Sequence, residues 1–499
     1  MSLEPVSRRH FFFGSLLAGA VPAGGFASQV SLKQLGYKSP NEKLNIAAIG
    51  AGGKGASDIA GCASENIVAL ADPDSVRAAR TFQQYEKATR YTDFRKMLDK
   101  ERSNIDAVIV ATPDHMHGTA TMWAIERGKH VYCQKPLTRT IWEARQLAQA
   151  AAKYKVATQM GNQGYSNDGT RQCAEMIWAG EIGEVKEVHA WTNRPVWPQG
   201  MERMPEEAAV PTTMDWESWI GVANMRPYSP AYAPFSWRGF FDFGCGALGD
   251  MACHILGAPN MALMLGSPTS VECIRQEGKS TFAYPKKSVI KFEFAARNNM
   301  PPVTIYWYDG MTGPPDRPKG LDEAELLGDL PRQRPAGAPA PGAGQGAGGG
   351  QGGGGARRAA GTPTGADVSN QVSARMAQAS PSSNGSLFVG DKGFITTGTY
   401  GENTRLVPSD KMKDYKMPAP LLTRSPGHYR DWIRAAKGGE RSCSDFSVAA
   451  PFTEWILLGV IALRFEGKLE WDSAKMRITN NKEANELIKP NFRKGWSFV

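Results

Sequence analysis

This sequence of 499 residues lacks the marks of a membrane protein and of a nucleic-acid-binding protein. Its apolar stretch near the N-terminus, from Phe13 to Val21, falls short of the roughly 20 residues that a helix needs to span a bilayer. We therefore expect no transmembrane helix in the mature protein and no stable membrane anchor. The 58 basic and 49 acidic residues are spread along the chain, without the concentrated basic footprint that binds phosphate backbones. We expect no nucleic-acid partner.

Paired cysteines are also missing. The seven cysteines are odd in number, scattered, and never spaced as Cys-x-x-Cys. This pattern predicts neither a disulfide scaffold nor a cysteine-based zinc site. The cysteines are Cys62, Cys133, Cys173, Cys245, Cys253, Cys273 and Cys443.

The N-terminal segment is typical of an export signal. Arg8 and Arg9 lie within Ser-Arg-Arg-His-Phe-Phe, and the apolar stretch and small residues suited to cleavage near Ala27 follow. The alternative is an ordinary amphipathic helix. We predict a twin-arginine signal peptide over residues 1–27, and a mature protein that is periplasmic or extracellular.

The chain is longer than one hydrophobic core usually organises, so we expect two domains. In the first, short apolar strands alternate with helical stretches, which predicts an α/β Rossmann domain with a doubly wound parallel sheet over residues 43–163. The expected strands cover 44–49, 67–71, 107–111 and 130–133, and the expected helices 56–63 and 118–127.

Residues 164–490 predict an α+β substrate domain with a mostly antiparallel open sheet. A Pro/Gly/Ala-rich tract over 332–379 is predicted to be a disordered insertion, because such a composition cannot offset its ordering entropy by burial. Strand-like residues 386–389 and 393–397 follow the tract, so we expect them to resume the same sheet. The earlier expected strands are 185–192, 270–276, 289–294 and 303–308.

A glycine motif follows the first expected strand. Gly50, Gly52 and Gly55 fit Gly-x-Gly-x-x-Gly, with Gly53 between them, and the motif leads into a helix. Missing side chains let the backbone approach a pyrophosphate at the helix N-terminus. Asp72 follows about 20 residues later, where an acid binds the adenosine ribose and favours NAD over NADP. The alternative for Asp72 is a helix cap.

Two further elements resemble the Gfo/Idh/MocA oxidoreductases. In that family a Thr-Pro-x-x-x-His element precedes a Glu-Lys-Pro element, and here they are Thr112, Pro113 and His117, then Gln134-Lys135-Pro136. Gln134 replaces the glutamate, which puts in doubt a proton relay through that carboxylate. The resemblance covers nearly the whole mature chain. It implies that Thr112, Pro113, His117, Gln134 and Lys135 line the cofactor site.

The resemblance also implies the catalytic residues. Lys135 occupies the place of a lysine that lies beside the nicotinamide and the reacting hydroxyl, where an ammonium stabilises alkoxide character. His254 occupies the place of the general base. Asp250 would bind substrate or orient that base, and the i, i+4 spacing puts both residues on one helical face. The alternative is a core histidine satisfied by a helix carboxylate.

His115 and His117 also suggest a metal site, since His-x-His occurs in zinc proteins. No third ligand follows at a suitable spacing, so we predict no metal and expect His117 to line the nicotinamide pocket or cap the next helix.

Aromatic residues are frequent between Trp191 and Phe243, and as a group they favour a carbohydrate substrate, although packing is the simpler explanation for any single ring. We expect substrate contacts from Gln163, Asn193, Arg194, Trp197 and Trp237.

Together these patterns predict an NAD(P)-dependent oxidoreductase that converts a hydroxyl of a sugar, glycoside or cyclitol into a ketone. Free NAD is scarce outside the cytoplasm, so we expect tightly held cofactor, and we expect a homo-oligomer, either a dimer or a tetramer. The alternatives are an NAD-dependent glycosidase or lyase that works by transient C3 oxidation, and a non-catalytic carbohydrate-binding protein.

Overall fold

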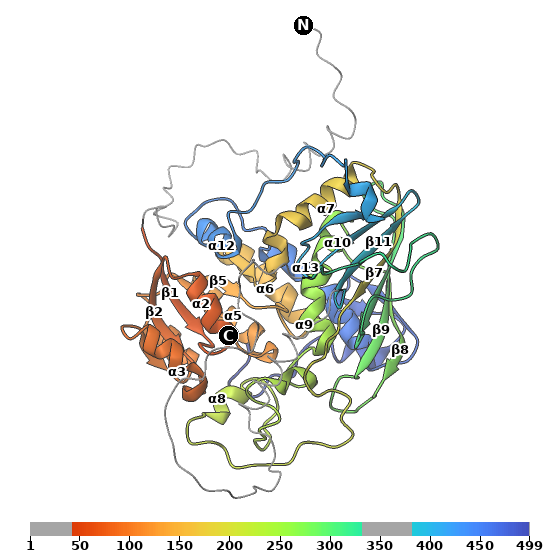
Figure 1. The fold of residues 1–499 in the computed structure, drawn as a ribbon. Helices are drawn as coiled ribbons and strands as arrows, with labels where there is room; N and C mark the ends of the chain where they lie inside the picture. The colour runs from red at the N-terminus through yellow and green to blue at the C-terminus, as the bar shows by residue number, and fades with distance from the viewer. Residues whose placement is uncertain (1–41, 332–381, 499) are drawn as a thin grey trace, which may run out of the picture.

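The computed structural model describes residues 42–331 and 382–498. The predicted signal peptide and the whole predicted insertion lie outside these residues. Two sheets stand apart with helices between them, one built from the first third of the chain and one from the remainder (Figure 1).

The first sheet is parallel and six-stranded, in the order β3-β2-β1-β4-β5-β6. This confirms the predicted Rossmann fold. The strand order reverses between β1 and β4, and ligands of such sheets bind outside the carboxyl ends of the strands at this switch point. The strands are β1 (Asn45–Ile49), β2 (Asn66–Ala71), β3 (Thr89–Tyr91), β4 (Ala107–Val110), β5 (His130–Cys133) and β6 (Thr158–Met160).

Helix starts in this domain follow their capping residues. The Asp74 side chain accepts from two backbone N–H groups of the first turn of α3, and Thr140 with Glu143 forms a capping box on α6. The helix expected from Gly118 begins earlier, directly after Pro113, because proline suits a helix start. The helices are α2 (Lys54–Gly61), α3 (Ser75–Gln84), α4 (Phe94–Lys100), α5 (Asp114–Glu126) and α6 (Ile141–Tyr154).

The second sheet has nine strands in the order β13-β12-β11-β7-β10-β9-β8-β14-β15. Its pairs are antiparallel apart from β7 with β10, which confirms the predicted mostly antiparallel sheet. β11 pairs with β7, so the chain does resume the same sheet after the insertion. The strands are β7 (Val185–Trp191), β8 (Ser270–Glu277), β9 (Lys287–Phe294), β10 (Val303–Asp309), β11 (Gly385–Gly390), β12 (Phe394–Thr397), β13 (Arg405–Val407), β14 (Lys468–Asp472) and β15 (Arg477–Ile478).

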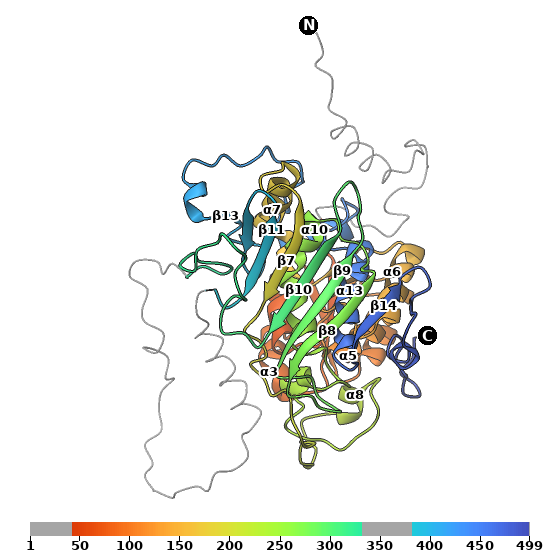
Figure 2. The same cartoon turned by 90° about the vertical axis from the view of Figure 1, so that its right-hand side faces the viewer.

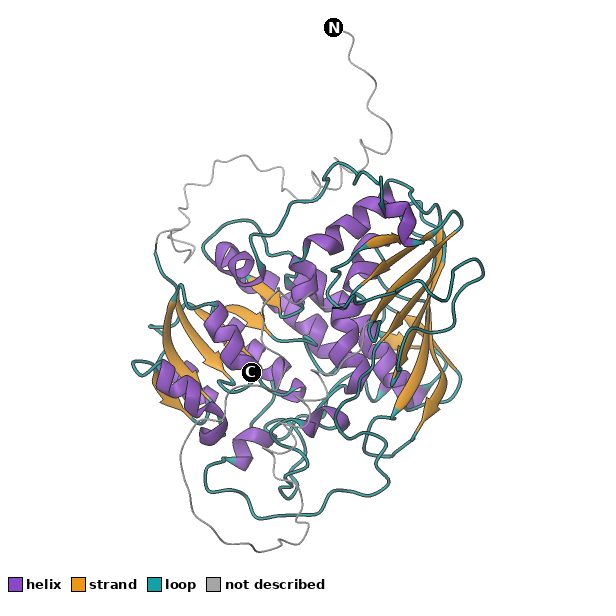
Figure 3. Ribbon diagram, viewed as in Figure 1, coloured by secondary structure: helices purple, strands orange, loops and turns teal. Residues whose placement is uncertain are grey.

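One face of this sheet is packed and the other is more open. Along β10, buried Val303, Ile305 and Trp307 alternate with half-buried residues, as expected for a strand covered on one side. Helices lie between this face and the Rossmann domain (Figure 3), whereas Figure 2 looks onto the opposite face. The remaining helices are η1 (Gln163–Ser166), α7 (Asp168–Trp178), α8 (Trp216–Ile220), η2 (Ser236–Gly239), α9 (Gly246–Ile255), α10 (Gly257–Ala262), η3 (Ser409–Met412), α12 (His428–Ala436), α13 (Phe446–Ala462) and α14 (Lys482–Asn485).

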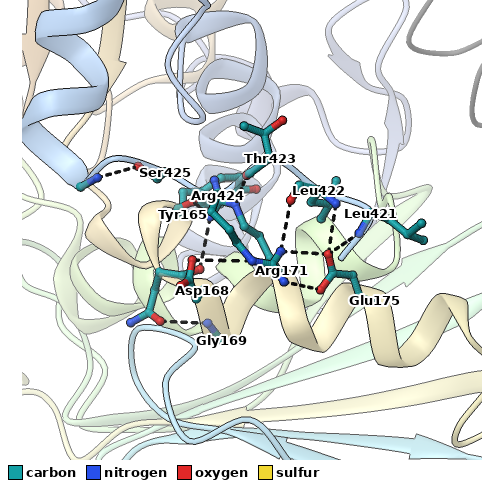
Figure 4. Close-up of polar contacts among 12 residues, drawn as sticks. Tyr165, Asp168, Gly169, Arg171, Glu175, Leu421, Leu422, Thr423, Arg424 and Ser425 are labelled. Carbon is teal, nitrogen blue, oxygen red and sulfur yellow. Dashed lines mark hydrogen bonds and ion pairs between the residues drawn. The ribbon is translucent and has the colours of Figure 1, made fainter. Parts of the chain in front are cut away.

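Long-range packing ties the end of the chain to the Rossmann domain. Before α12 the chain is anchored on α7, where Glu175 accepts from the Leu421 and Leu422 amides and pairs with Arg424 at 2.7 Å (Figure 4). The helix that follows this contact, α12, packs on the first sheet. Trp432 of α12 is fully buried in the same hydrophobic cluster as Ile46 of β1. Within the described residues, no helix is both long and apolar enough to cross a membrane.

Candidate active site

The loop between β1 and α2 has no room for side chains. A Cβ on Gly50 would lie 2.5 Å from the Ala111 carbonyl oxygen, and one on Gly55 would lie 1.9 Å from the Gly50 carbonyl oxygen. Gly50 and Gly53 also have positive φ angles of 87° and 55°, which favour glycine. No side chain caps α2, which begins at the switch point of the sheet, and the Gly55 amide of its first turn donates to the Gly52 carbonyl at 3.1 Å. The predicted glycine motif therefore forms a cradle suited to a pyrophosphate.

Asp72 supports this loop directly. Its Oδ2 accepts from the Ala51 and Gly52 amides at 2.8 and 3.0 Å, and its Oδ1 accepts from the Asp74 amide. Burial raises the pKa of Asp72 to about 6, against the effect of these hydrogen bonds. The helix-capping alternative for Asp72 is wrong, because Asp74 caps α3. The carboxylate that was expected to read a ribose thus also fixes the shape of the cradle.

Arg77 is an addition that the sequence did not reveal. Its side chain crosses the loop. A Cβ added to Gly52 would lie 2.5 Å from Arg77 Cγ, and one added to Gly53 would lie 2.5 Å from Arg77 Nη2. It enters the site because α3 starts beside the loop after β2. A guanidinium at this place matches the charge of a pyrophosphate.

At the other end of the site, two buried polar atoms lack partners within the described residues. They are Thr112 Oγ1, after β4, and Asn162 Nδ2, after β6. Both follow the carboxyl ends of strands, where the far half of a dinucleotide would lie. Orphaned buried donors and acceptors are costly unless a ligand satisfies them. The cradle and these atoms therefore fit a nicotinamide dinucleotide.

Gln134 belongs to a buried network behind the loop. Its Nε2 donates to Asp58 Oδ2 of α2 at 2.8 Å, and Asp58 also accepts from the Tyr429 hydroxyl at 2.7 Å. Desolvation raises the pKa of Asp58, which Lys54 partly opposes. A glutamate at position 134 would set two carboxylates against each other here. An amide at position 134 avoids this repulsion. A proton relay through a glutamate at this position, which the sequence already put in doubt, has no carboxylate here.

The predicted catalytic residues meet in front of β5. Lys135 Nζ donates to Asp250 Oδ1 at 2.8 Å and to the Asp250 carbonyl at 3.0 Å, across the two domains. Arg238 Nε also donates to Asp250 Oδ1, at 3.3 Å. Burial alone would raise the pKa of Asp250, but Lys135 and Arg238 hold it well below its usual range. Asp250 is thus a fixed anion that positions the Lys135 ammonium.

His254 lies one turn after Asp250 on α9, as the i, i+4 spacing predicts. Its Nδ1 is buried and has no hydrogen-bond partner in the described part of the chain. Burial and the neighbouring Lys135 lower the pKa of His254 well below 6.5. The imidazole is therefore neutral at pH 7, with a lone pair available to accept a proton.

Three residues near this triad were missed at the level of sequence. Asp114 opens α5 and accepts from the Cys245 amide, and burial raises its pKa to about 7. Arg238 lies in η2, and Tyr400 lies in the loop between β12 and β13, with its ring edge on His254 at 4.8 Å. Tyr400 is 146 positions after His254, so no local spacing could have linked them.

His115 and His117 are structural. His117 Nδ1 lies 2.7 Å from the Pro136 carbonyl and its Nε2 lies 2.9 Å from the Thr112 carbonyl, so the ring joins two loops. His115 contacts two other backbone carbonyls. Burial lowers their pKa values to about 3 for His115 and about 4 for His117. Among the described residues, no group of three or more His, Cys, Asp or Glu is arranged to hold a metal.

The predicted sugar-binding rings are mostly packing. Trp197 and Trp237 are only 4% and 5% exposed, so neither offers an open face to a pyranose. Their rings instead surround the Arg238 guanidinium, with centroid distances of 5.9 and 4.2 Å. Trp237 also belongs to a buried aromatic cluster, so packing accounts for many of the rings in this region. That cluster includes Trp216, Trp219, Tyr228, Tyr232, Trp237, Phe240 and Phe243.

Asn193, Arg194 and Gln163 are the other expected substrate contacts. Asn193 and Arg194 follow the end of β7, and the Arg194 side chain donates to Asn193 Oδ1. Gln163 begins η1, directly after Asn162, and is half-buried.

Family models match both halves of the site. Residues 44–162 match the model described as "Oxidoreductase family, NAD-binding Rossmann fold", and residues 181–283 match "Oxidoreductase family, C-terminal alpha/beta domain". Both segments are thus similar to domains of the Gfo/Idh/MocA oxidoreductases.

Relatives with curated names match only part of this chain. Inositol 2-dehydrogenase 4 of Saccharopolyspora erythraea is 29% identical over 206 residues, which are 39% of this chain and 60% of that protein. Levoglucosan dehydrogenase of Pseudarthrobacter phenanthrenivorans is 27% identical over 192 residues, or 38% of this chain and 40% of that protein. The chain thus spans less than two thirds of either relative.

The WlbA dehydrogenase of Bordetella pertussis, solved with NADH and UDP-GlcNAcA, shares the fold. It superposes with a TM-score of 0.53 at 14% identity, over 86% of this chain and 99% of that chain. At this identity the likeness extends to the fold alone.

Proposed function

We propose that the protein is a nicotinamide-dependent oxidoreductase that converts a hydroxyl of a sugar, glycoside or cyclitol into a ketone. The observation that carries this proposal is the contact of Lys135 with Asp250 at 2.8 Å, beside the neutral His254, at the end of a dinucleotide cradle. The family of both domains and the dehydrogenases among the relatives support it.

The reaction divides among the residues as follows. The bound nicotinamide supplies the hydride acceptor for the carbinol carbon. His254 takes the hydroxyl proton, since its imidazole is neutral and its Nδ1 has no competing partner in the described residues. The Lys135 ammonium donates a hydrogen bond to the same oxygen as negative charge develops there. Asp250 and Arg238 hold that ammonium in place.

For the cofactor itself we propose NAD in preference to NADP, held tightly. Asp72 puts a carboxylate at the end of β2, where a 2′-phosphate would be repelled. The glycine cradle, Arg77 and the α2 N-terminus would hold the pyrophosphate, and Thr112 with Asn162 would satisfy the far half.

Product identity tests the proposed reaction. Purified protein with its bound cofactor is incubated with sugars, glycosides and cyclitols, and the products are followed by mass spectrometry and by the absorbance of reduced nicotinamide. We expect a keto product together with reduced cofactor. A cleaved glycoside without net redox change would support the glycosidase alternative instead, and no product from any compound would favour a binding protein.

We further propose that the protein is exported by the twin-arginine route, on the evidence of Arg8, Arg9 and the apolar stretch that follows. Changing both arginines to lysine is expected to leave the precursor inside the cell, as measured by fractionation and immunoblotting. Because lysine keeps the positive charge, a loss of export cannot be due to a change in the charge of this segment. Efficient export of the double variant would refute the assignment.

A further inference from the structure

The substrate end of the site gathers three cations, and Asp329 and Glu402 are further carboxylates that act on Arg194 and Tyr400 respectively. Lys135, Arg238 and Arg194 lie around Asp250, which is the buried anion that Lys135 and Arg238 share. Asp114 also lies close, but burial raises its pKa to about 7, so near neutral pH it supplies only part of a charge. His254 adds none, because its imidazole is neutral.

Arg194 is the least compensated of these cations. It is 8% exposed, and burial lowers its pKa. Its Nε is buried without a hydrogen-bond partner in residues 42–331 and 382–498, and no carboxylate there lies within ion-pair distance of it. Asp250 and Asp329 act on it only from further away. Asp329 is already engaged, because it accepts from the Thr399 amide and hydroxyl at 2.7 and 2.8 Å.

Tyr400 faces the same place from the second sheet. Its ring edge packs on His254 and it is 39% exposed, so it lies at the surface of the site. Lys135, Asp250, Glu402 and Arg194 all influence its phenol electrostatically.

Arg238 presents its remaining donor group rigidly. Its Nε binds Asp250 and its Nη1 binds the Phe235 carbonyl at 3.1 Å, which leaves Nη2 without a hydrogen bond in the described residues. The Phe235 and Trp237 rings lie 4.3 and 4.2 Å from the guanidinium carbon. These contacts already fix the Arg238 guanidinium, so it loses little further conformational entropy when it binds a ligand.

We propose that the substrate carries an anionic group, the carboxylate of a sugar acid or the phosphate of a sugar phosphate, which Arg194, Arg238 and Tyr400 bind. This inference rests on the proposed function and specifies its substrate class. A buried guanidinium without a counter-ion is costly, and a ligand anion removes that cost while satisfying Arg194 Nε. A neutral hydroxyl accepts a hydrogen bond but leaves the charge uncompensated.

Matched pairs of sugars test the proposal. Methyl glycosides of glucose, galactose and mannose are compared with the corresponding methyl uronides and 6-phosphates, on the holoprotein, by calorimetric binding and by reduction of the bound cofactor. We expect an anionic member of a pair to bind at least about 10-fold more tightly than its neutral partner, the size of a hydrogen bond to a charged group. The uronide and phosphate arms identify which anion is preferred.

Substitution at Arg194 then separates binding of the anion from general damage. In Arg194→Gln the ratio of anionic to neutral affinity is expected to fall by about 10-fold or more, and Arg194→Lys should recover part of it. Arg441→Gln is the matched control, because that side chain is 83% exposed and lies 3.9 Å from Asp445, outside the proposed site.

Three results would overturn the proposal: neutral sugars bind as well as anionic ones, the affinity ratio is unchanged in Arg194→Gln, or no anionic sugar binds at all. If anionic sugars bind but none is oxidised, the inference about charge stands and the proposed reaction fails.

Discussion

Replacing Lys135 with alanine lowers turnover on the true substrate by about 100-fold or more, while the bound cofactor is retained. A loss of this size is typical when a positioned acid–base or electrostatic group is removed. Lys135 touches Asp250 and no part of the glycine cradle, so the pyrophosphate site stays intact. His254→Ala should behave in the same way, because it removes the proton acceptor. Turnover and the nicotinamide released on denaturation are both measured.

Lys475→Ala is a suitable control for this prediction, because that side chain is 76% exposed and pairs only with Asp472 near the second sheet. Melting temperatures distinguish catalytic loss from unfolding, since Lys135→Ala leaves Asp250 with Arg238 as its remaining ion-pair partner. Normal turnover in both Lys135→Ala and His254→Ala, with cofactor still bound, would show that these residues are structural.

The second large effect is expected at Gly55. Its added Cβ would lie 1.9 Å from the Gly50 carbonyl oxygen, so Gly55→Ala forces α2 away from the loop after β1. The N-terminus of α2 then no longer meets the pyrophosphate. Losing two hydrogen bonds to a charged group corresponds to about 100-fold or more in affinity. We therefore expect cofactor content after desalting to fall below about a tenth of its original value.

Gly313→Ala provides the matched control, because nothing lies within 4 Å of its added Cβ. Gly52→Val should act in the same direction as Gly55→Ala, although its nearest atom belongs to the flexible Arg77 side chain. Full cofactor content in Gly55→Ala would mean that the dinucleotide does not rely on this helix.

Local sequence pattern was sufficient for most of the fold. Each strand expected in the Rossmann domain is present, because apolar runs and glycine turns act over a few residues. β3 and β6, of three residues each, were too short to stand out. The later strands 386–389 and 393–397 were also found, since both are short strand-like runs that follow the tract.

The site was only half predictable. Lys135, Asp250 and His254 could be identified because their motifs are local, whereas Asp114, Arg238 and Tyr400 join them only through tertiary contacts. Trp197 and Trp237 were expected to bind substrate, because the residue type alone does not distinguish a ring that stacks on a sugar from a ring that packs in the interior. Here the packing around Arg238 decided their place.

The burial of α12 against the first sheet bears on the order in which the chain folds during synthesis. Trp432 and Ile433 complete the cluster that contains Leu44 and Ile46, yet they emerge from the ribosome nearly 390 residues later. Until then the nascent first domain exposes an apolar patch beside β1, and the last buried tryptophan, Trp496, comes later still and packs on Phe94. The first domain to be made is therefore among the last to be finished, and a chaperone that shields this patch would act through most of translation.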